Sequence, residues 1–163
     1  MPDINFINDS LLNQPDLAVS NVFEEKESQE YSAASFFIDK YKIIYRHSKI
    51  TPAKTGRFVT IWKRNDAGIT RPFDIMDDFD FMMIAAVKEA NSGIFIFSKD
   101  TLRQHGVVSI NGTGGKRGMR VYPPWDVATN KQAIKTQEWQ TKHFINLNKE
   151  NDAAADTIAK IFS

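Results

Sequence analysis

The stretch NGTGGKRGMR, from Asn111 to Arg120, combines glycines with basic residues and is the segment most typical of an anion-binding loop. Glycines allow backbone N–H groups to approach a phosphate closely, and Lys116, Arg117 and Arg120 add positive charge to the same turn. The spacing is not that of a Walker A loop, which would need glycine in place of Ile110 and Ser or Thr in place of Arg117. The sequence therefore leaves two alternatives, a grip on phosphates and a solvated hairpin turn.

A second group of cations lies in residues 40–64, where basic and aromatic side chains are interleaved. Cations neutralise phosphates and aromatic rings stack on bases, so this composition is typical of a nucleic-acid-binding surface. Together with the cations of the glycine-rich loop, we expect phosphate contacts from Lys49, Lys54, Arg57, Lys63 and Arg64.

The charge is unevenly distributed along the chain, although the net charge is only +1. Residues 1–39 hold eight acidic residues and one basic, whereas residues 40–73 hold nine basic residues and one acidic. A neutral total can still carry a basic face, which is what an anionic partner encounters. The alternative is that the acidic N-terminal segment pairs with these cations and neutralises them.

Two tryptophans could supply a contact surface beside the cations. Trp125 follows two prolines that fix the backbone, so it is a candidate for stacking or for wedging between bases. Trp139 shares one side of a predicted helix with Lys131, Lys135 and Lys142. The competing interpretation of Trp139 is that it packs under a loop, which is the more common fate of a tryptophan.

The acidic stretch DIMDDFD offers Asp74, Asp77, Asp78 and Asp80. Alternation in an extended strand would place Asp78 and Asp80 on one face as a Mg²⁺ pair, although acidic loop residues are usually only solvated. The histidines are scattered, and there is no G-x-S-x-G motif. We therefore expect no catalytic residue, no metal site and no cofactor.

Hydrophobic periodicity predicts the elements that must position these residues. Residues 41–48 alternate, which predicts a three-stranded meander over residues 30–64 whose third strand is 58–64. Residues 81–87 and 93–97 predict a second hairpin, buried on both faces.

The helices are predicted from their caps. Acidic helical pieces are expected over residues 1–29, and a short helix after Ser98 ends at Gly106. A capping box at Thr129 and Gln132 predicts a long helix to about residue 147. A last short helix is expected over residues 152–162.

The bulk properties predict one soluble domain over residues 1–163, with an acidic helical segment 1–29, a core 30–147 and a C-terminal segment 148–163. There is no cysteine, no apolar leader and no apolar run long enough for a membrane span, so a cytoplasmic protein without a membrane partner is expected. The pattern favours an α+β fold, a mixed and mostly antiparallel sheet flanked by helices.

Four stretches together resemble the MepB-like family over roughly residues 24–147. They are KITPAKTGRFVTIWKRN (49–65), DDFDFMMI (77–84), GIFIFSKDTLRQHGVVS (93–109) and GKRGMRVYPPWDVATNKQAIKTQEWQ (115–140). The family takes its name from a protein encoded beside a multidrug efflux pump and a MarR-type repressor. The resemblance implies a small bacterial cytoplasmic α+β protein, and it brings no catalytic residues with it.

The expected order of elements is also similar to the core of the PD-(D/E)XK nucleases. Such a site needs two carboxylates to hold Mg²⁺ beside a lysine. The expected strand reads Ile61-Trp62-Lys63, so the second carboxylate is missing, and Glu30 with Asp39 alone would make a poor site. If the comparison applies, this chain binds without cutting.

Three functions follow from these patterns. The first is a non-catalytic nucleic-acid-binding protein that grips DNA or RNA phosphates through a basic surface. The second is a Mg²⁺-dependent nuclease or phosphotransfer enzyme that uses Asp78 and Asp80. The third is a regulatory protein whose Pro-Pro-Trp corner and Trp139 meet a protein partner.

Overall fold

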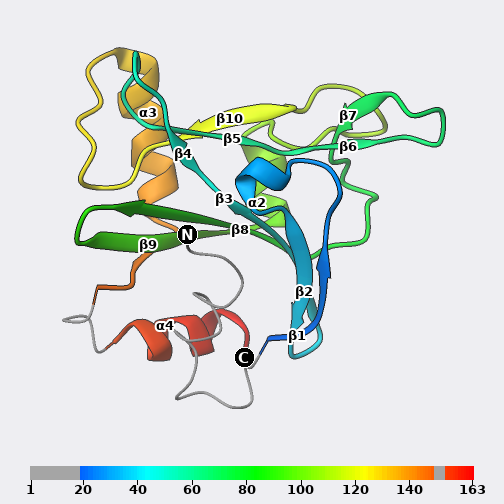
Figure 1. Cartoon of the computed structure of the whole chain (residues 1–163), viewed down its shortest axis with the longest axis horizontal. Helices are drawn as coiled ribbons and strands as arrows, with labels where there is room; N and C mark the ends of the chain where they lie inside the picture. The colour runs from blue at the N-terminus through cyan, green and yellow to red at the C-terminus, as the bar shows by residue number, and fades with distance from the viewer. Residues whose placement is uncertain (1–18, 149–152) are drawn as a thin grey trace.

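The computed structural model describes residues 19–148 and 153–163, which form one α+β domain (Figure 1). The strands are β1 (Val19–Glu24), β2 (Ala34–Ile38), β3 (Tyr41–His47), β4 (Lys49–Ile50), β5 (Arg57–Thr60), β6 (Trp62–Arg64), β7 (Thr70–Pro72), β8 (Phe81–Lys88), β9 (Asn91–Ser98), β10 (Gly118–Val121) and β11 (Phe144–Asn146). The helical elements are η2 (Gln29–Tyr31), α2 (Lys99–Gln104), α3 (Lys131–Thr141) and α4 (Ala154–Ile161). The predicted fold class is therefore confirmed, while the similarity to the nuclease core stays a prediction.

A six-stranded sheet of order β1-β2-β3-β8-β9-β11 forms the centre of the domain. The predicted hairpins β2–β3 and β8–β9 are both present and antiparallel, and Asp39 has the positive φ of a tight turn. The pair β3–β8 is parallel, with Ile43 opposite Phe81 and His47 opposite Ala85. These central strands are buried on both faces, as the sequence predicts for residues 81–87 and 93–97.

The predicted meander over residues 30–64 is wrong in its third strand. The second neighbour of β3 is β8, and residues 58–64 divide into β5 and β6, which lie in two smaller sheets of order β10-β5-β4 and β6-β7. The eight-residue β8 offers β3 a longer backbone ladder than the four-residue β5 does. Val59 and Ile61 are instead buried against one face of the large sheet.

The predicted helix over residues 1–29 is wrong over Val19–Glu24, and of the described range only Gln29 is helical, as the first residue of η2. Residues 1–18 lie outside the described part, and Val19–Glu24 forms β1, an edge strand that pairs with β2. All residues of β1 after Val19 are exposed, which is how an edge strand can carry acidic side chains into solvent.

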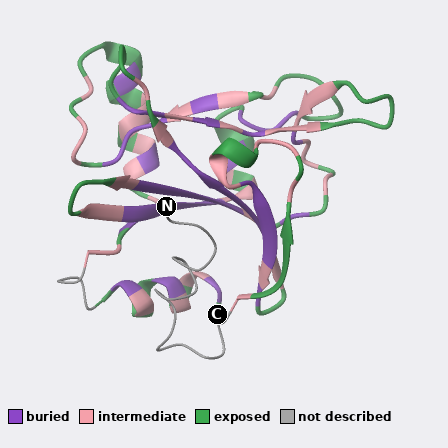
Figure 2. Ribbon diagram, in the orientation of Figure 1, coloured by how far each residue is buried: buried purple, intermediate pink, exposed green. Residues whose placement is uncertain are grey.

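Two apolar layers sandwich the large sheet, because successive side chains of a strand point to opposite faces. Ile43, Met83 and Ile96 face one layer, which α4 covers with Ala154, Ile158 and Phe162. Ile44, Ile84 and Phe97 face the other layer, which holds β5, β10 and Leu102 of α2. Figure 2 shows the middle of the sheet buried and the edge strand β1 exposed.

The helices confirm some predictions and correct others. Ser98 caps α2 by accepting a hydrogen bond from the Thr101 amide, and Gly106 has a φ of +69°, as predicted. Helix α3 is capped by Asn130 rather than Thr129, and it ends at Thr141. The expected last turn is strand β11 instead, since Phe144–Asn146 complete the sheet edge beside β9. The predicted C-terminal helix is α4.

Within the described residues, no helix is both long enough and apolar enough to cross a membrane.

Candidate functional site between helix α3 and strand β10

A groove of about 940 Å³ lies between α3, β10 and two loops. One wall is α3. The floor includes Met119 of β10 and Tyr122, which is the residue that follows β10. The loop 51–56 and the loop 105–116 close the other sides. We refer to this depression as the α3 groove.

Glutamines of α3 fix the helix against β10 and the corner that follows it. The buried Gln140 accepts a hydrogen bond from the Tyr122 amide at 2.9 Å and donates to the Arg120 carbonyl at 3.0 Å. Gln137 donates to the carbonyls of Pro123 and Asp126. These glutamines satisfy backbone groups that have no partner strand to pair with. Polar residues on the inner side of α3 therefore hold the helix in place as the wall of the groove.

Arg120 holds the loop 51–56 in place. Its guanidinium donates to the Thr51 hydroxyl at 2.7 Å and to the Thr55 carbonyl at 3.3 Å. Gly56 has a φ of +85°, and a Cβ there would lie 2.6 Å from the ring of Tyr122, so only glycine allows the loop this close. The loop presents Lys54 to the groove.

The charged residues that line the α3 groove are mostly basic. Glu138 is the only carboxylate in the described lining, against the five cations Lys54, Lys116, Arg120, Lys135 and Lys142. No ion pair joins any of the five to a carboxylate in the described part of the chain. Three of them, Lys54, Lys116 and Arg120, are among the residues predicted from the sequence to contact phosphates.

The glycine-rich loop is hydrogen-bonded to a carboxylate from another segment, Asp74. The Asp74 carboxylate accepts hydrogen bonds from the Ser109 hydroxyl at 2.6 Å and the Gly112 amide at 3.0 Å. These bonds, with one from the Met76 amide, lower the pKa of Asp74. The Gly112 amide already donates a hydrogen bond to Asp74, so it is not free to bind a phosphate. The Lys116 amide donates to the Val107 carbonyl. The loop contributes the side chain of Lys116 to the groove.

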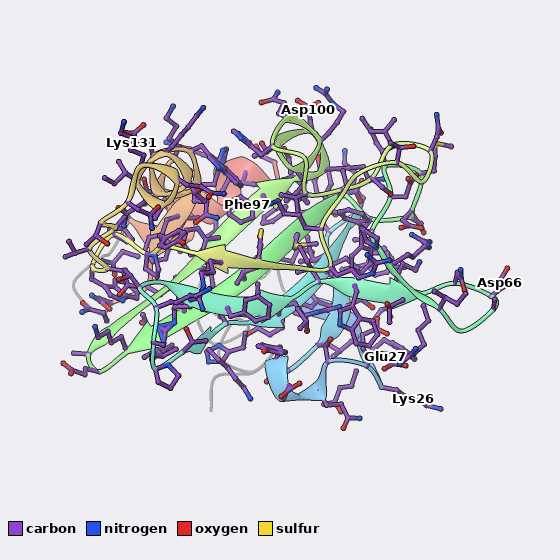
Figure 3. All side chains as sticks on the ribbon, turned by 90° about the horizontal axis from the view of Figure 1, so that it is seen from above. Lys26, Glu27, Asp66, Phe97, Asp100 and Lys131 are labelled. Carbon is purple, nitrogen blue, oxygen red and sulfur yellow. The ribbon has the colours of Figure 1, made fainter. Side chains whose placement is uncertain are left out.

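Three other basic residues that were predicted to contact phosphates lie beside carboxylates outside the α3 groove. Arg64 pairs with Glu27 at 2.7 Å, Lys63 lies 3.4 Å from Asp77, and Lys49 lies 4.0 Å from Glu30. Figure 3 shows Glu27 close to the hairpin whose tip carries Asp66. Two of these partners, Glu27 and Glu30, come from the acidic N-terminal segment, so the alternative of internal neutralisation applies at this end of the molecule.

The remaining arginines donate to backbone carbonyls. Arg117 donates to the Thr70 carbonyl at 3.1 Å. Arg57 is only 3% exposed, its Nη2 donates to the Val87 carbonyl, and burial lowers its pKa. Burial, together with nearby Arg57 and Lys49, lowers the pKa of His47 to about 4. Neither Arg57 nor Arg117 lines the α3 groove.

The two tryptophans have different surroundings. Trp125 is half-buried edge-on against Phe144, with ring centroids 5.5 Å apart, and lies outside the α3 groove. Trp139 lies in the groove and stacks on His105 at 3.9 Å, with an interplanar angle of 5°. The helical spacing of Trp139 with Lys135 and Lys142 indicates this wall, whereas no sequence signal identifies His105.

Two carboxylates of the acidic stretch, Asp77 and Asp80, accept hydrogen bonds from within the protein. Asp80 accepts a hydrogen bond from the Lys42 amide, and it precedes β8 together with Asp78, so the expected strand alternation does not apply to them. Asp77 accepts a bidentate pair of hydrogen bonds from Arg71 at 2.8 and 2.9 Å. Among the described residues, no three His, Asp or Glu side chains lie together in a way that could hold a metal ion.

The fold and the groove define a class, a small α+β protein with a mixed sheet and a largely basic surface groove beside one helix. The MepB-like family model matches residues 25–146, and the chain therefore belongs to the MepB-like family. A crystal structure of MepB is similar at 33% sequence identity with a TM-score of 0.80, covering 92% of this chain and 100% of that one. No curated protein matches the chain.

Proposed function

We propose that this protein is a non-catalytic nucleic-acid-binding protein that holds a phosphate backbone in the α3 groove. The observation that carries the proposal is the convergence of five cations from four segments on one groove with a single carboxylate in its described lining. Such clustered charge attracts a polyanion and gains free energy from the release of its counterions.

The side chains in the groove support this proposal over a simple solvated surface. Arg120 is fixed by hydrogen bonds to neutral groups, so its charge is held in place without being neutralised. Lys54 and Lys116 project from exposed loops, while Lys135 of α3 and Lys142, the residue that follows α3, line the other side of the groove. Positive charge on both sides suits a strand that runs along the groove.

Binding to a fluorescently labelled oligonucleotide, titrated with salt, tests the proposal. Each phosphate contact adds about 0.7 to the slope of log K against log salt for a single strand, so five contacts give a slope of about −3.5. The double variant K135E/K142E should weaken binding by about tenfold or more and reduce the magnitude of the slope by about 1.4 or more.

The matched control is K40E/K160E, which makes the same charge change on exposed residues outside the groove. Lys160 is on α4, which covers the opposite face of the large sheet. We expect this variant to bind like the unmodified protein in moderate salt. Equal weakening by both variants, or no binding of any oligonucleotide at low salt, contradicts the proposal.

The two other functions stay predictions that separate experiments address. Incubation of plasmid DNA and RNA with the protein and Mg²⁺ or Mn²⁺ tests the nuclease, and we expect intact substrates. A pull-down from the native host tests a protein partner. Gln137 holds the Pro-Pro-Trp corner on α3 through backbone carbonyls, and Pro124 of this corner is exposed.

A further inference from the structure

Three aromatic rings are in contact from the core to the surface of the α3 groove. Phe97 is completely buried, and the ring of Trp139 contacts it at a centroid distance of 5.3 Å and an interplanar angle of 51°. His105 lies on Trp139 at 3.9 Å and nearly parallel to it. Figure 3 shows Phe97 in the interior of the molecule, in the layer beside α3. These ring contacts fix the indole between the core and the outer imidazole.

The imidazole of His105 is the outermost ring of this stack. His105 is exposed and lines the groove, and it is the last residue of the α2 turn before Gly106. Partial desolvation of the exposed ring, and then the charge of Lys142, lowers the pKa of His105 below its ordinary value. The lowered pKa favours the neutral imidazole, and a flat ring that lies parallel to an indole offers a stacking surface.

The size of the groove is compatible with a single strand. Its volume of about 940 Å³ is within the range of about 300–1,000 Å³ found for small-molecule sites. Such a space has room for a few nucleotides of one strand, whereas a duplex would lie across its rim. In a duplex the bases are also stacked on one another, so an aromatic platform has no free base face to meet.

We propose that the α3 groove takes single-stranded nucleic acid, with one unpaired base stacked on the outer face of His105. The proposal rests on the proposed function, because the cations Lys54, Lys116, Arg120, Lys135 and Lys142 would hold the phosphates that flank this base. Stacking tolerates any base, so we expect no strong sequence preference. The same chemistry serves DNA and RNA, and the test includes both.

The experiment measures the anisotropy of labelled strands of about 12 nucleotides, a length within the site sizes of single-strand binders. The probes are single-stranded DNA, single-stranded RNA, a DNA duplex of equal length, and a strand of equal length made of abasic residues. We expect at least one of the single strands to bind about tenfold or more tightly than the duplex and the abasic strand.

Variants of His105 locate the effect in the ring stack. H105A should weaken single-strand binding about tenfold, while H105F, which keeps an aromatic ring, should retain it. On the abasic strand H105A should have no effect, because there is no base to lose. Thermal unfolding of both variants shows that they are folded.

The outcomes separate the two proposals. If none of the probes binds, the proposed function itself fails. If single strand, duplex and abasic strand bind equally and H105A changes none of them, the single-strand inference is overturned, while phosphate binding in the groove stands. Equal weakening of single-strand binding by H105A and H105F also overturns the stacking role.

Discussion

The two ends of the small sheets differ in how they use basic residues. At one end, α3, β10 and the loop 51–56 surround the α3 groove, and at the other the β6–β7 hairpin projects from the molecule (Figure 1). At the hairpin end Arg71 and Lys63 share Asp77, a group that we call the Asp77 cluster, and Arg64 pairs with Glu27. The cations of the groove have no such carboxylate partner among the described residues.

The difference shows that positive residues in one stretch of sequence can serve two purposes. Charges that meet carboxylates hold the hairpin against the domain and are neutralised there, so they attract a polyanion only weakly. Charges without a partner cost some stability through repulsion but remain available to an anion. The following predictions test whether stability and binding really separate between the two ends.

The largest effect is expected on removing a carboxylate from the Asp77 cluster. Asp77→Ala leaves Arg71, Lys63 and the Asp74 amide without their acceptor, so we expect a loss of about 3 kcal/mol in the free energy of unfolding. Urea unfolding measures it. The matched variant in the groove, Glu138→Ala, should change the free energy of unfolding by no more than about 0.5 kcal/mol. Similar losses in both variants would remove the distinction between the two ends.

A smaller effect on the free energy of unfolding is expected from lowering the pH. Burial raises the pKa of Asp77, but the hydrogen bond from Arg71, the Asp74 amide and the charge of Lys63 outweigh it and lower the pKa from 3.8 to about 2. The folded-state pKa is below the unfolded one, so this contribution is present above about pH 4 and is lost as the pH falls through 2.

We expect this contribution to be roughly 1 to 2 kcal/mol, since solvent reaches Lys63 and Arg71 and screens the pair. The measurement is urea unfolding of the unmodified protein and Asp77→Asn between about pH 5 and pH 2. The difference in the free energy of unfolding between the two proteins should shrink as the pH falls. A difference that is independent of pH would show that the cluster acts through packing and not through charge.

The smallest effect is expected from the carboxylate of the α3 groove. Glu138→Gln removes the one negative charge of the described lining, so oligonucleotide binding should tighten about two- to threefold at low salt. Glu27→Gln, which frees Arg64 at the hairpin end, is the control and should leave affinity unchanged. Tighter binding by Glu27→Gln would extend the binding surface to the hairpin.

Local patterns predicted the elements whose signals are short-range. The alternation in residues 41–48, the apolar runs at 81–87 and 93–97, and the cap at Ser98 all correspond to observed elements. The helix after Thr129 was predicted too long, because the pairing of Phe144 with Phe95 in the sheet is a contact between distant residues. An acidic composition likewise gave no sign that Val19–Glu24 would become an edge strand.

By itself, the sequence determined the α+β class, the hairpins and the identity of the basic residues, since each depends on neighbours along the chain. Only the tertiary structure decided which cations have a carboxylate beside them. Coulomb interactions depend on distance in space and not along the chain, so Arg64 and Lys54 can be alike in sequence while one meets Glu27 and the other lines an open groove. The same holds for His105, whose contact with Trp139 joins two segments that no local pattern connects.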